Sequence, residues 1–142
     1  MTIQDITVAY TAVATAENGR DGRVFSDDGR LDVVVNPPKA LGGSGAGTNP
    51  EQLFAAGYSA CFQGALGVVA RQEKADISGS TVTAAVSIGK TADGGFGLEV
   101  VISATIPNVD TATAQSLIEK AHQVCPYSNA TRGNIKVELS VV

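Results

Sequence analysis

The sequence predicts an α+β protein in which antiparallel strands are grouped in hairpins and two helices lie between them. Apolar residues alternate with polar or small residues in several short segments, as they do on strands with one buried face. Two longer patterns, after residues 50 and 110, have the signals of helices. Turn residues separate these segments. We therefore expect the order β, β, α, β, β, α, β, in one domain that spans residues 1–142.

The N-terminal third predicts two strands. Residues 1–15 are rich in Thr, Val and Ala and predict the first strand. Asn-Gly and Asp-Gly pairs place turns at residues 18–23 and 26–29. Alternation predicts the second strand over residues 31–35, and the two prolines at 37–38 end it.

A long helix is predicted after the glycine-rich loop at residues 42–47. Thr48 or Asn49 can cap it, Pro50 suits its first position, and Glu51 lies in its first turn, where the helix dipole favours a negative charge. The pattern continues to about residue 73 and is apolar on several faces. One stripe contains Phe54, Tyr58, Cys61, Ala65 and Val69. A helix that is apolar nearly all round is a buried helix, so we expect other parts of the protein to cover it, including a second subunit.

The C-terminal half predicts a hairpin, a helix and a last strand. Strands over residues 82–88 and 96–106 are joined by a turn at 93–95. Asp110 is the expected N-cap of the second helix, which ends at Cys125-Pro126. The inner face of this helix is expected to carry Ala114, Leu117, Ile118 and Ala121. The last strand is expected over residues 135–141.

Composition and charge exclude several classes of partner. The chain has 10 Lys and Arg against 14 Asp and Glu, a net charge of −4, so it lacks the basic footprint of a nucleic-acid-binding protein. We expect no membrane association, because no apolar run approaches the roughly 20 residues of a membrane span. The first residues do not resemble a secretory signal, so a cytoplasmic location is expected. With 20 Ala and 16 Gly the core of one chain is thin, which also favours burial between subunits.

The two cysteines, Cys61 and Cys125, are the first candidates for chemistry. They could be inert buried thiols, although cysteines that do react in the cytosol are usually catalytic or redox-sensing. A nucleophilic Cys61 needs its pKa lowered from about 8.5. Cys61 lies about 16 Å along the helix from Pro50, too far for the helix dipole, so a cation from elsewhere must activate it. The candidates are Arg20, Arg23, Arg30, Lys39, Arg71 and Arg132, and spacing does not choose among them.

Two other residues have alternative interpretations. Glu51 precedes Cys61 by ten residues, about 15 Å on one helix. It is either a carboxylate that only stabilises the helix end, or it reaches a cysteine site through a helix break near Gly57 or from a partner chain. His122 and Cys125 lie at i and i+3 and could form a zinc site with Cys61. A lone histidine is more often a packed or surface residue.

Three segments together resemble the organic hydroperoxide resistance (Ohr) branch of the OsmC/Ohr family. Residues 47–62 (GTNPEQLFAAGYSACF) are similar to the first signature of these proteins, and residues 122–134 (HQVCPYSNATRGN) to the second. The turn at residues 19–22 (GRDG) resembles the family's arginine loop. The resemblance implies an intertwined homodimer in which antiparallel sheets wrap central helices.

The resemblance also implies a cysteine-based peroxidase that reduces organic, including fatty-acyl, hydroperoxides. Cys61 matches the peroxidatic cysteine and Cys125 the resolving one, with which it forms a disulfide. Arg20 matches the arginine that stabilises the thiolate, and Glu51 the glutamate that holds Arg20. No bound cofactor is implied, and the expected reductant is dihydrolipoamide on a lipoylated protein. The alternatives are an OsmC-type peroxidase of broader substrate range and a thiol redox sensor without turnover.

Overall fold

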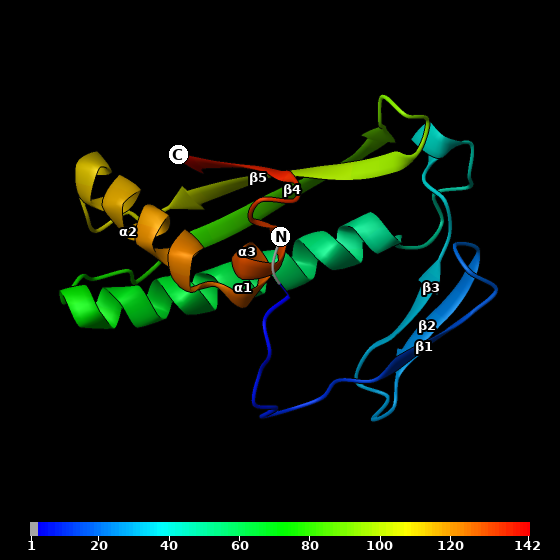
Figure 1. Cartoon of the computed structure of the whole chain (residues 1–142), viewed down its shortest axis with the longest axis horizontal. Helices are drawn as coiled ribbons and strands as arrows, with labels where there is room; N and C mark the ends of the chain where they lie inside the picture. Colours follow the sequence, from blue (N-terminus) through cyan, green and yellow to red (C-terminus); the bar gives the residue numbers. More distant parts are fainter. Residues whose placement is uncertain (1–2) are drawn as a thin grey trace. The chain divides into compact units, whose positions relative to one another are not determined.

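The computed structural model describes residues 3–142, and Figure 1 shows its helices and strands. The chain forms two compact units, Met1–Leu53 and Phe54–Val142, which are described separately. The expectation of one domain over the whole chain stays a prediction.

The first unit contains a three-stranded antiparallel sheet in the order β1-β2-β3. Its strands are β1 (Ala14–Glu17), β2 (Gly22–Ser26) and β3 (Asp32–Val35). The prediction of a strand over residues 1–15 is wrong in extent, because only its last two residues lie in β1 and the rest of its described part forms no strand. Residues 1–2 of that prediction lie outside the described residues. β2 was not predicted, because the turn signals on both sides leave only a short apolar segment between them.

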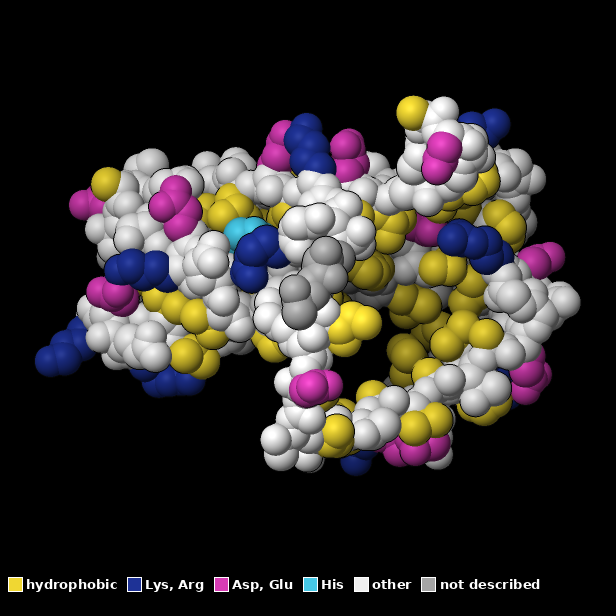
Figure 2. Space-filling model, viewed as in Figure 1, with side chains coloured by type: hydrophobic (Ala, Val, Ile, Leu, Met, Phe, Trp, Pro, Cys, Tyr) yellow, Lys and Arg dark blue, Asp and Glu magenta, His cyan; other side chains and the backbone are white. Residues whose placement is uncertain are grey.

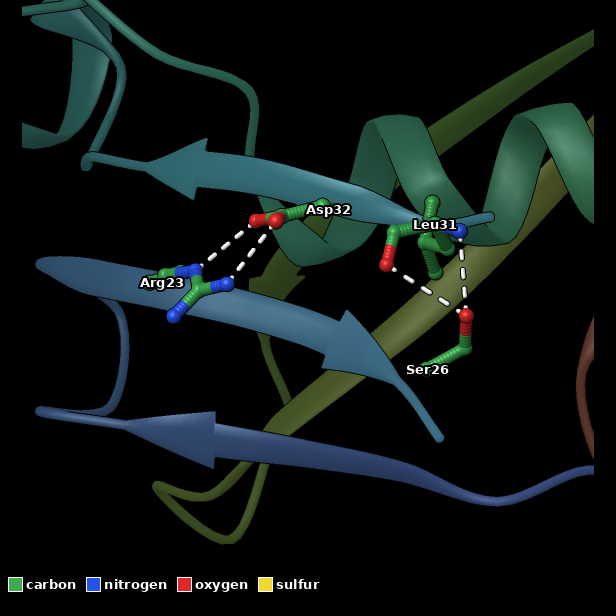
Figure 3. A network of polar contacts seen from close by, with 4 residues as sticks. All are labelled: Arg23, Ser26, Leu31 and Asp32. Atoms are coloured by element: carbon green, nitrogen blue, oxygen red, sulfur yellow. Dashed lines mark hydrogen bonds and ion pairs between the residues drawn. The ribbon is translucent and has the colours of Figure 1, made fainter. Parts of the chain in front are cut away.

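Polar side chains hold the turn between β2 and β3 (Figure 3). Arg23 donates two hydrogen bonds of 2.8 Å to the carboxylate of Asp32 on the neighbouring strand. The Ser26 hydroxyl accepts from the backbone N–H of Leu31 at 3.0 Å, across the same turn. The first pair joins β2 to β3 and the second closes the turn between them, so side chains as well as the backbone support this hairpin.

The second unit contains a three-helix and three-strand arrangement. Its first helix, α1 (Pro50–Glu73), begins in the last residues of the first unit, and η1 (Lys39–Leu41), a single 3₁₀ turn, precedes it in that unit. The other elements are β4 (Thr81–Lys90), β5 (Phe96–Thr105), α2 (Thr111–Val124), α3 (Pro126–Thr131) and β6 (Lys136–Val141). The predicted caps are present: Asn49 accepts from the N–H of Gln52, and Asp110 accepts from the N–H of Thr113. The short α3 was not predicted.

The second sheet is mixed, in the order β4-β5-β6. β4 and β5 form the predicted antiparallel hairpin, but β5 and β6 are parallel, so the expectation of purely antiparallel sheets is wrong here. The physical reason is the connection: α2 and α3 carry the chain back along the sheet before β6 begins, and a crossover of this kind joins parallel strands.

One hydrophobic core holds the second unit together. Most of its fully buried members come from α1, β5 and α2, and they include Tyr58, Phe62, Leu66, Ile102, Leu117 and Ile118. All four residues expected on the inner face of α2 are buried. The alternating residues of β4 and β6 pack against this cluster, as their sequence period predicts. Cys125 belongs to the core, and Cys61 packs against it.

Among the described residues, α1 is the one helix long and apolar enough to cross a membrane by length and composition alone. A core helix passes the same test, and six residues of α1 are buried within the protein. On the face drawn in Figure 2, the Lys and Arg side chains of the described residues are scattered among Asp and Glu side chains and form no continuous basic patch.

Candidate active site

The structure brings the two predicted cysteines together. Cys61 lies in the middle of α1 and Cys125 lies between α2 and α3, 64 positions later in the chain. Both are free thiols, and their sulfur atoms are 3.5 Å apart, with the Cys125 thiol donating toward Cys61. Cys125 is fully buried, whereas Cys61 is partly exposed. This arrangement allows a reagent from solvent to reach Cys61 first and Cys125 to react with the product.

Cys125 is positioned by the corner between two helices. Its backbone is extended (φ −61°, ψ 124°), and its N–H donates to the carbonyl of Ala121 at the end of α2. Pro126 is the first residue of α3, a position that tolerates a residue without an N–H. Pro126 therefore both ends α2 and begins α3. The corner between the two helices directs the Cys125 thiol toward Cys61 of α1.

Within the second unit the Cys61 thiol is not yet activated. Burial is the largest influence and raises the pKa of the Cys61 thiol above its ordinary value. The backbone N–H of Tyr127 hydrogen-bonds to this thiol and acts in the opposite direction. None of the four strongest influences is a cation. The expectation from the sequence, that a cation from elsewhere activates Cys61, stays a prediction.

The ring of Tyr127 occupies space that a glycine leaves open on α1. A Cβ at Gly57 would lie 3.1 Å from the Tyr127 hydroxyl oxygen and 3.2 Å from a ring carbon. The ring also makes aromatic contacts with Tyr58 and Phe54, at centroid distances of 5.8 and 6.3 Å. These contacts hold the start of α3 against α1 and keep the Tyr127 N–H beside Cys61.

The first unit contains the other predicted pair, Arg20 and Glu51. The guanidinium of Arg20 donates two hydrogen bonds to the Glu51 carboxylate, of 3.1 and 2.9 Å. The Arg20 side chain is 49% exposed and that of Glu51 is 13% exposed. Hydrogen bonding from Arg20 lowers the pKa of Glu51, so this carboxylate is ionised at neutral pH. Arg20 is thus a fixed cation that remains partly open to solvent.

The β1–β2 turn presents Arg20. Asn18 and Gly19 both have positive φ (59° and 58°), which the tight turn requires and which Asn tolerates better than most residues. Asn18 also closes the turn by donating to the Asp21 carbonyl at 2.7 Å. The Asp21 carboxylate accepts from the side chain of Asn36 at 2.7 Å, which ties the turn to the residue after β3.

Glu51 is positioned by the start of α1. Thr48 forms a bridge to Val35 at the end of β3, and its N–H donates to the carbonyl of Val34 at 3.0 Å. The sheet that carries Arg20 therefore also holds the residues directly before α1. The helix break considered at Gly57 does not occur, because α1 is continuous from Pro50 to Glu73.

His122 does not join the cysteines in a metal site. Among residues 3–142 there is no group of three or more His, Cys, Asp or Glu side chains that could hold a metal ion. Instead, the Nδ1 atom of His122 lies 2.7 Å from the Ser128 hydroxyl. Arg132, another candidate cation, donates to the His122 carbonyl at 2.6 Å. Burial and the charge of Arg132 lower the pKa of His122.

Sequence reasoning missed the backbone N–H of Tyr127 and the side chain of Ser128. A signal for the first was present: a proline that begins a helix leaves the next N–H groups without helical partners. Ser128 gave no such signal, because its contacts depend on residues from two other helices.

Comparisons with known proteins identify the family of this chain. The family described as OsmC-like protein matches residues 42–140. An organic hydroperoxide resistance protein of Xanthomonas axonopodis pv. citri is 54% identical over 136 residues, covering 94% of this chain and 95% of the relative. The crystal structure of an organic hydroperoxide resistance protein from Elizabethkingia anophelis has a TM-score of 0.90 and 57% identity, with 96% of this chain and 98% of that chain covered. For OhrB of Bacillus subtilis the TM-score is 0.87 and the identity 46%, with 95% of this chain and 100% of that chain covered. This chain belongs to the OsmC/Ohr family, in its organic hydroperoxide resistance branch.

Proposed function

We propose that this protein is a thiol peroxidase that reduces organic hydroperoxides to alcohols. The observation that carries the proposal is the pair of free thiols 3.5 Å apart, one partly exposed and one fully buried. The names of the relatives, organic hydroperoxide resistance proteins, support the substrate class. The aromatic side chains of Phe54 and Tyr127, which are not fully buried and pack together between α1 and the start of α3, are compatible with an apolar substituent on the peroxide.

Cys61 is the peroxidatic residue in the proposed reaction. Its thiolate attacks one oxygen of the O–O bond, which breaks, and the other oxygen takes a proton and leaves as the alcohol. Cys61 is thereby oxidised to a sulfenic acid. The Cys125 thiol then attacks the sulfenic sulfur, a disulfide forms, and the sulfenic oxygen leaves as water. An external dithiol restores both thiols by exchange and is itself oxidised to a disulfide.

Arg20 supplies the cation in this proposal, and Glu51 holds it. A guanidinium beside the Cys61 sulfur favours the thiolate, which offsets the rise in the pKa of Cys61 caused by burial. Because α1 is continuous, Glu51 and Cys61 of the same chain are about 15 Å apart along it. The proposed site therefore combines Cys61 and Cys125 of one subunit with Glu51 of the partner.

Exposed apolar residues support the proposed homodimer. Ala56, Ala60 and Gly64 form a stripe of small residues along α1 that is exposed in the single chain. Near the N-terminus, Ile6 and Tyr10 are 80% and 81% exposed. Apolar surface of this kind is stabilised by covering it, and a second copy of the chain would cover it on both subunits at once.

The proposed reductant is dihydrolipoamide carried by a lipoylated protein, and no bound cofactor takes part. A dithiol suits the step, because its second thiol attacks the mixed disulfide. The protein thiol is then released and the reductant leaves as a cyclic disulfide. The proposed location is the cytoplasm, where protein thiols are kept reduced between turnovers.

Addition of one equivalent of cumene hydroperoxide to the reduced protein tests the chemistry. Intact mass should fall by two hydrogens per chain, as the Cys61–Cys125 disulfide forms. Cys61→Ser should not react. Cys125→Ser should stop at the sulfenic acid with one equivalent and gain further oxygen atoms only when more peroxide is added. A protein whose mass stays unchanged is not a peroxidase of this kind.

Turnover separates an enzyme from a sensor. With excess dihydrolipoamide, the enzyme consumes many equivalents of cumene hydroperoxide, whereas a redox sensor consumes about one. The same assay with hydrogen peroxide tests specificity, because an equal rate would favour the OsmC-type peroxidase of broader range.

A mixed dimer tests the shared site. One subunit carries Cys61→Ser and the other carries Glu51→Ala. If Glu51 serves the partner's cysteine, both changes fall in the same site and one intact site remains per dimer. Loss of activity at both sites would show instead that each chain uses its own Glu51.

A further inference from the structure

A buried chain of hydroxyl groups links α3 to α1 beside the two cysteines. The Tyr58 hydroxyl lies 2.9 Å from the Ser128 hydroxyl and 3.0 Å from the Thr131 hydroxyl. Ser128 in turn lies 2.7 Å from Nδ1 of His122. Tyr58 and Ser128 are fully buried and Thr131 is 5% exposed, so water does not substitute for these contacts. Neither the peroxidatic step nor the resolving step described above uses this group of four.

One assignment of donors and acceptors to these side chains satisfies every hydrogen bond among them. Thr131 donates its one hydroxyl proton to the backbone carbonyl of Ser128, at 3.2 Å, because a carbonyl can only accept. Thr131 must therefore accept from Tyr58, and Tyr58 must accept from the Ser128 hydroxyl. Ser128 then has no proton left for His122, and Nδ1 of the imidazole has to be the donor. The reverse assignment leaves the Thr131 hydroxyl facing the carbonyl without a proton.

These hydrogen-bonded side chains lie on the elements that hold the resolving cysteine. His122 is in the last turn of α2 and Ser128 is in the first turn of α3, so their hydrogen bond spans the corner that contains Cys125. Tyr58 attaches this corner to α1, three residues before Cys61. The 3.5 Å between the sulfur atoms has to shorten to about 2.05 Å when the disulfide forms. A corner that is closed by the His122–Ser128 hydrogen bond and attached to α1 through Tyr58 favours that small approach over larger movements.

We propose that His122, as its Nδ1–H tautomer, is a positioning residue for the resolving step. Its Nδ1–H donates to the Ser128 hydroxyl and completes this group of hydrogen bonds, which holds Cys125 opposite Cys61. Burial, and then the charge of Arg132, lower the pKa of His122 and favour the neutral ring, which carries one nitrogen-bound proton. This inference rests on the proposed peroxidase function and adds to it a residue that contacts neither sulfur.

Nitrogen-15 NMR of the reduced wild-type protein tests the tautomer directly. Two-bond correlations from the carbon-bound ring protons should assign the one nitrogen-bound proton of His122 to Nδ1. A proton on Nε2 would mean that Ser128 donates to the ring, and would overturn the proposal without any mutation.

Two substitutions at His122 test the kinetic consequence. His122→Asn places an amide N–H close to where Nδ1 lies, whereas His122→Leu removes the donor. After rapid mixing with cumene hydroperoxide, acid quenching, alkylation and intact mass measure the sulfenic acid and the disulfide separately. His122→Leu should close the disulfide about tenfold more slowly than wild type, the usual effect of leaving a buried polar group without its partner. His122→Asn should stay within about twofold, and sulfenic acid formation should be unchanged in both.

The outcomes distinguish the two proposals. Slow closure diverts Cys61 to the sulfinic acid, so His122→Leu should also accumulate protein that is two oxygen atoms heavier. Equal closure rates in wild type, His122→Leu and Tyr58→Phe would refute the positioning role and leave the peroxidase intact. Tyr58→Phe keeps the buried ring and decides the question if His122→Leu does not fold. A wild-type protein that forms no disulfide would instead refute the proposed function.

Discussion

Substitution of Gly22 by alanine should disrupt the hairpin that presents Arg20. A Cβ at Gly22 would lie 2.0 Å from the carbonyl oxygen of Glu17, on the neighbouring strand. Ordinary contact begins at 3.4 Å, so the two backbones would have to separate by about 1.4 Å. The obstacle is backbone on both sides, so no side-chain rotation relieves it. We expect a cost of about 3 kcal/mol, the upper part of the range for overpacking, concentrated in the β1–β2 hairpin.

Gly29→Ala is the matched control. Gly29 lies in the other turn of the same sheet, has a φ of 72°, and has nothing within 4 Å of an added Cβ. Its substitution should lower the free energy of unfolding by about 1 kcal/mol, because alanine is disfavoured in the left-handed conformation and no clash is added. Both variants are full-length, and both change one glycine to alanine.

Hydrogen exchange of the hairpin amides, followed by mass spectrometry, measures the difference. About 3 kcal/mol corresponds to roughly a hundredfold loss of protection in β1 and β2, against about fivefold for Gly29→Ala. Gly22→Ala should also slow the reaction of Cys61 with cumene hydroperoxide, because the turn no longer holds Arg20. Equal protection in the two variants would refute the steric argument.

Three further predictions concern the Arg20–Glu51 ion pair and the contact between Gly57 and Tyr127. Arg20→Met should raise the pKa of the Cys61 thiol, measured by the pH dependence of its alkylation, because the proposed cation is lost; an unchanged profile would remove Arg20 from the site. Because the pKa of Glu51 is lowered by Arg20, the ion pair should contribute to stability above the ordinary Glu pKa of about 4.3 and lose that contribution as the pH falls through the lowered value. Urea unfolding of Glu51→Gln should therefore lack part of the acid-dependent loss seen in wild type, and identical pH profiles would contradict this. Gly57→Ala should displace the ring of Tyr127, whose hydroxyl would lie 3.1 Å from the new Cβ, and raise the pKa of the Cys61 thiol as the Tyr127 N–H withdraws. A gain of about 1 kcal/mol in helix propensity without any change in thiol pKa would show that Tyr127 does not position that N–H.

Local signals in the sequence predicted the elements of the second unit well. Asp110 caps α2 as expected, and the four residues expected on its inner face are buried. The alternation over residues 82–88 and 135–141 corresponds to β4 and β6. These signals are reliable because caps, turns and buried faces depend on residues within a few positions of one another.

Two elements were missed because one local signal has two meanings. Pro126 indicates the end of α2, but proline also suits the first position of a helix, where it begins α3. The turn residues on both sides of β2 concealed a strand whose length is only five residues. In both places the sheet or helix partners decided the outcome, and they lie outside the local sequence.

The sequence by itself determined the family and the two cysteines, and it predicted that a nucleophilic Cys61 needs a cation that the helix dipole cannot replace. Only the tertiary structure decided that Cys61 and Cys125 lie 3.5 Å apart, that Arg20 holds Glu51 with two hydrogen bonds, and that β6 runs parallel to β5. It also decided that His122 contacts Ser128 rather than a thiol. The physical reason is sequence separation: the two cysteines are 64 positions apart and Arg20 and Glu51 are 31 apart. Contacts over such distances are set by how helices and strands pack, and no local period or cap records them.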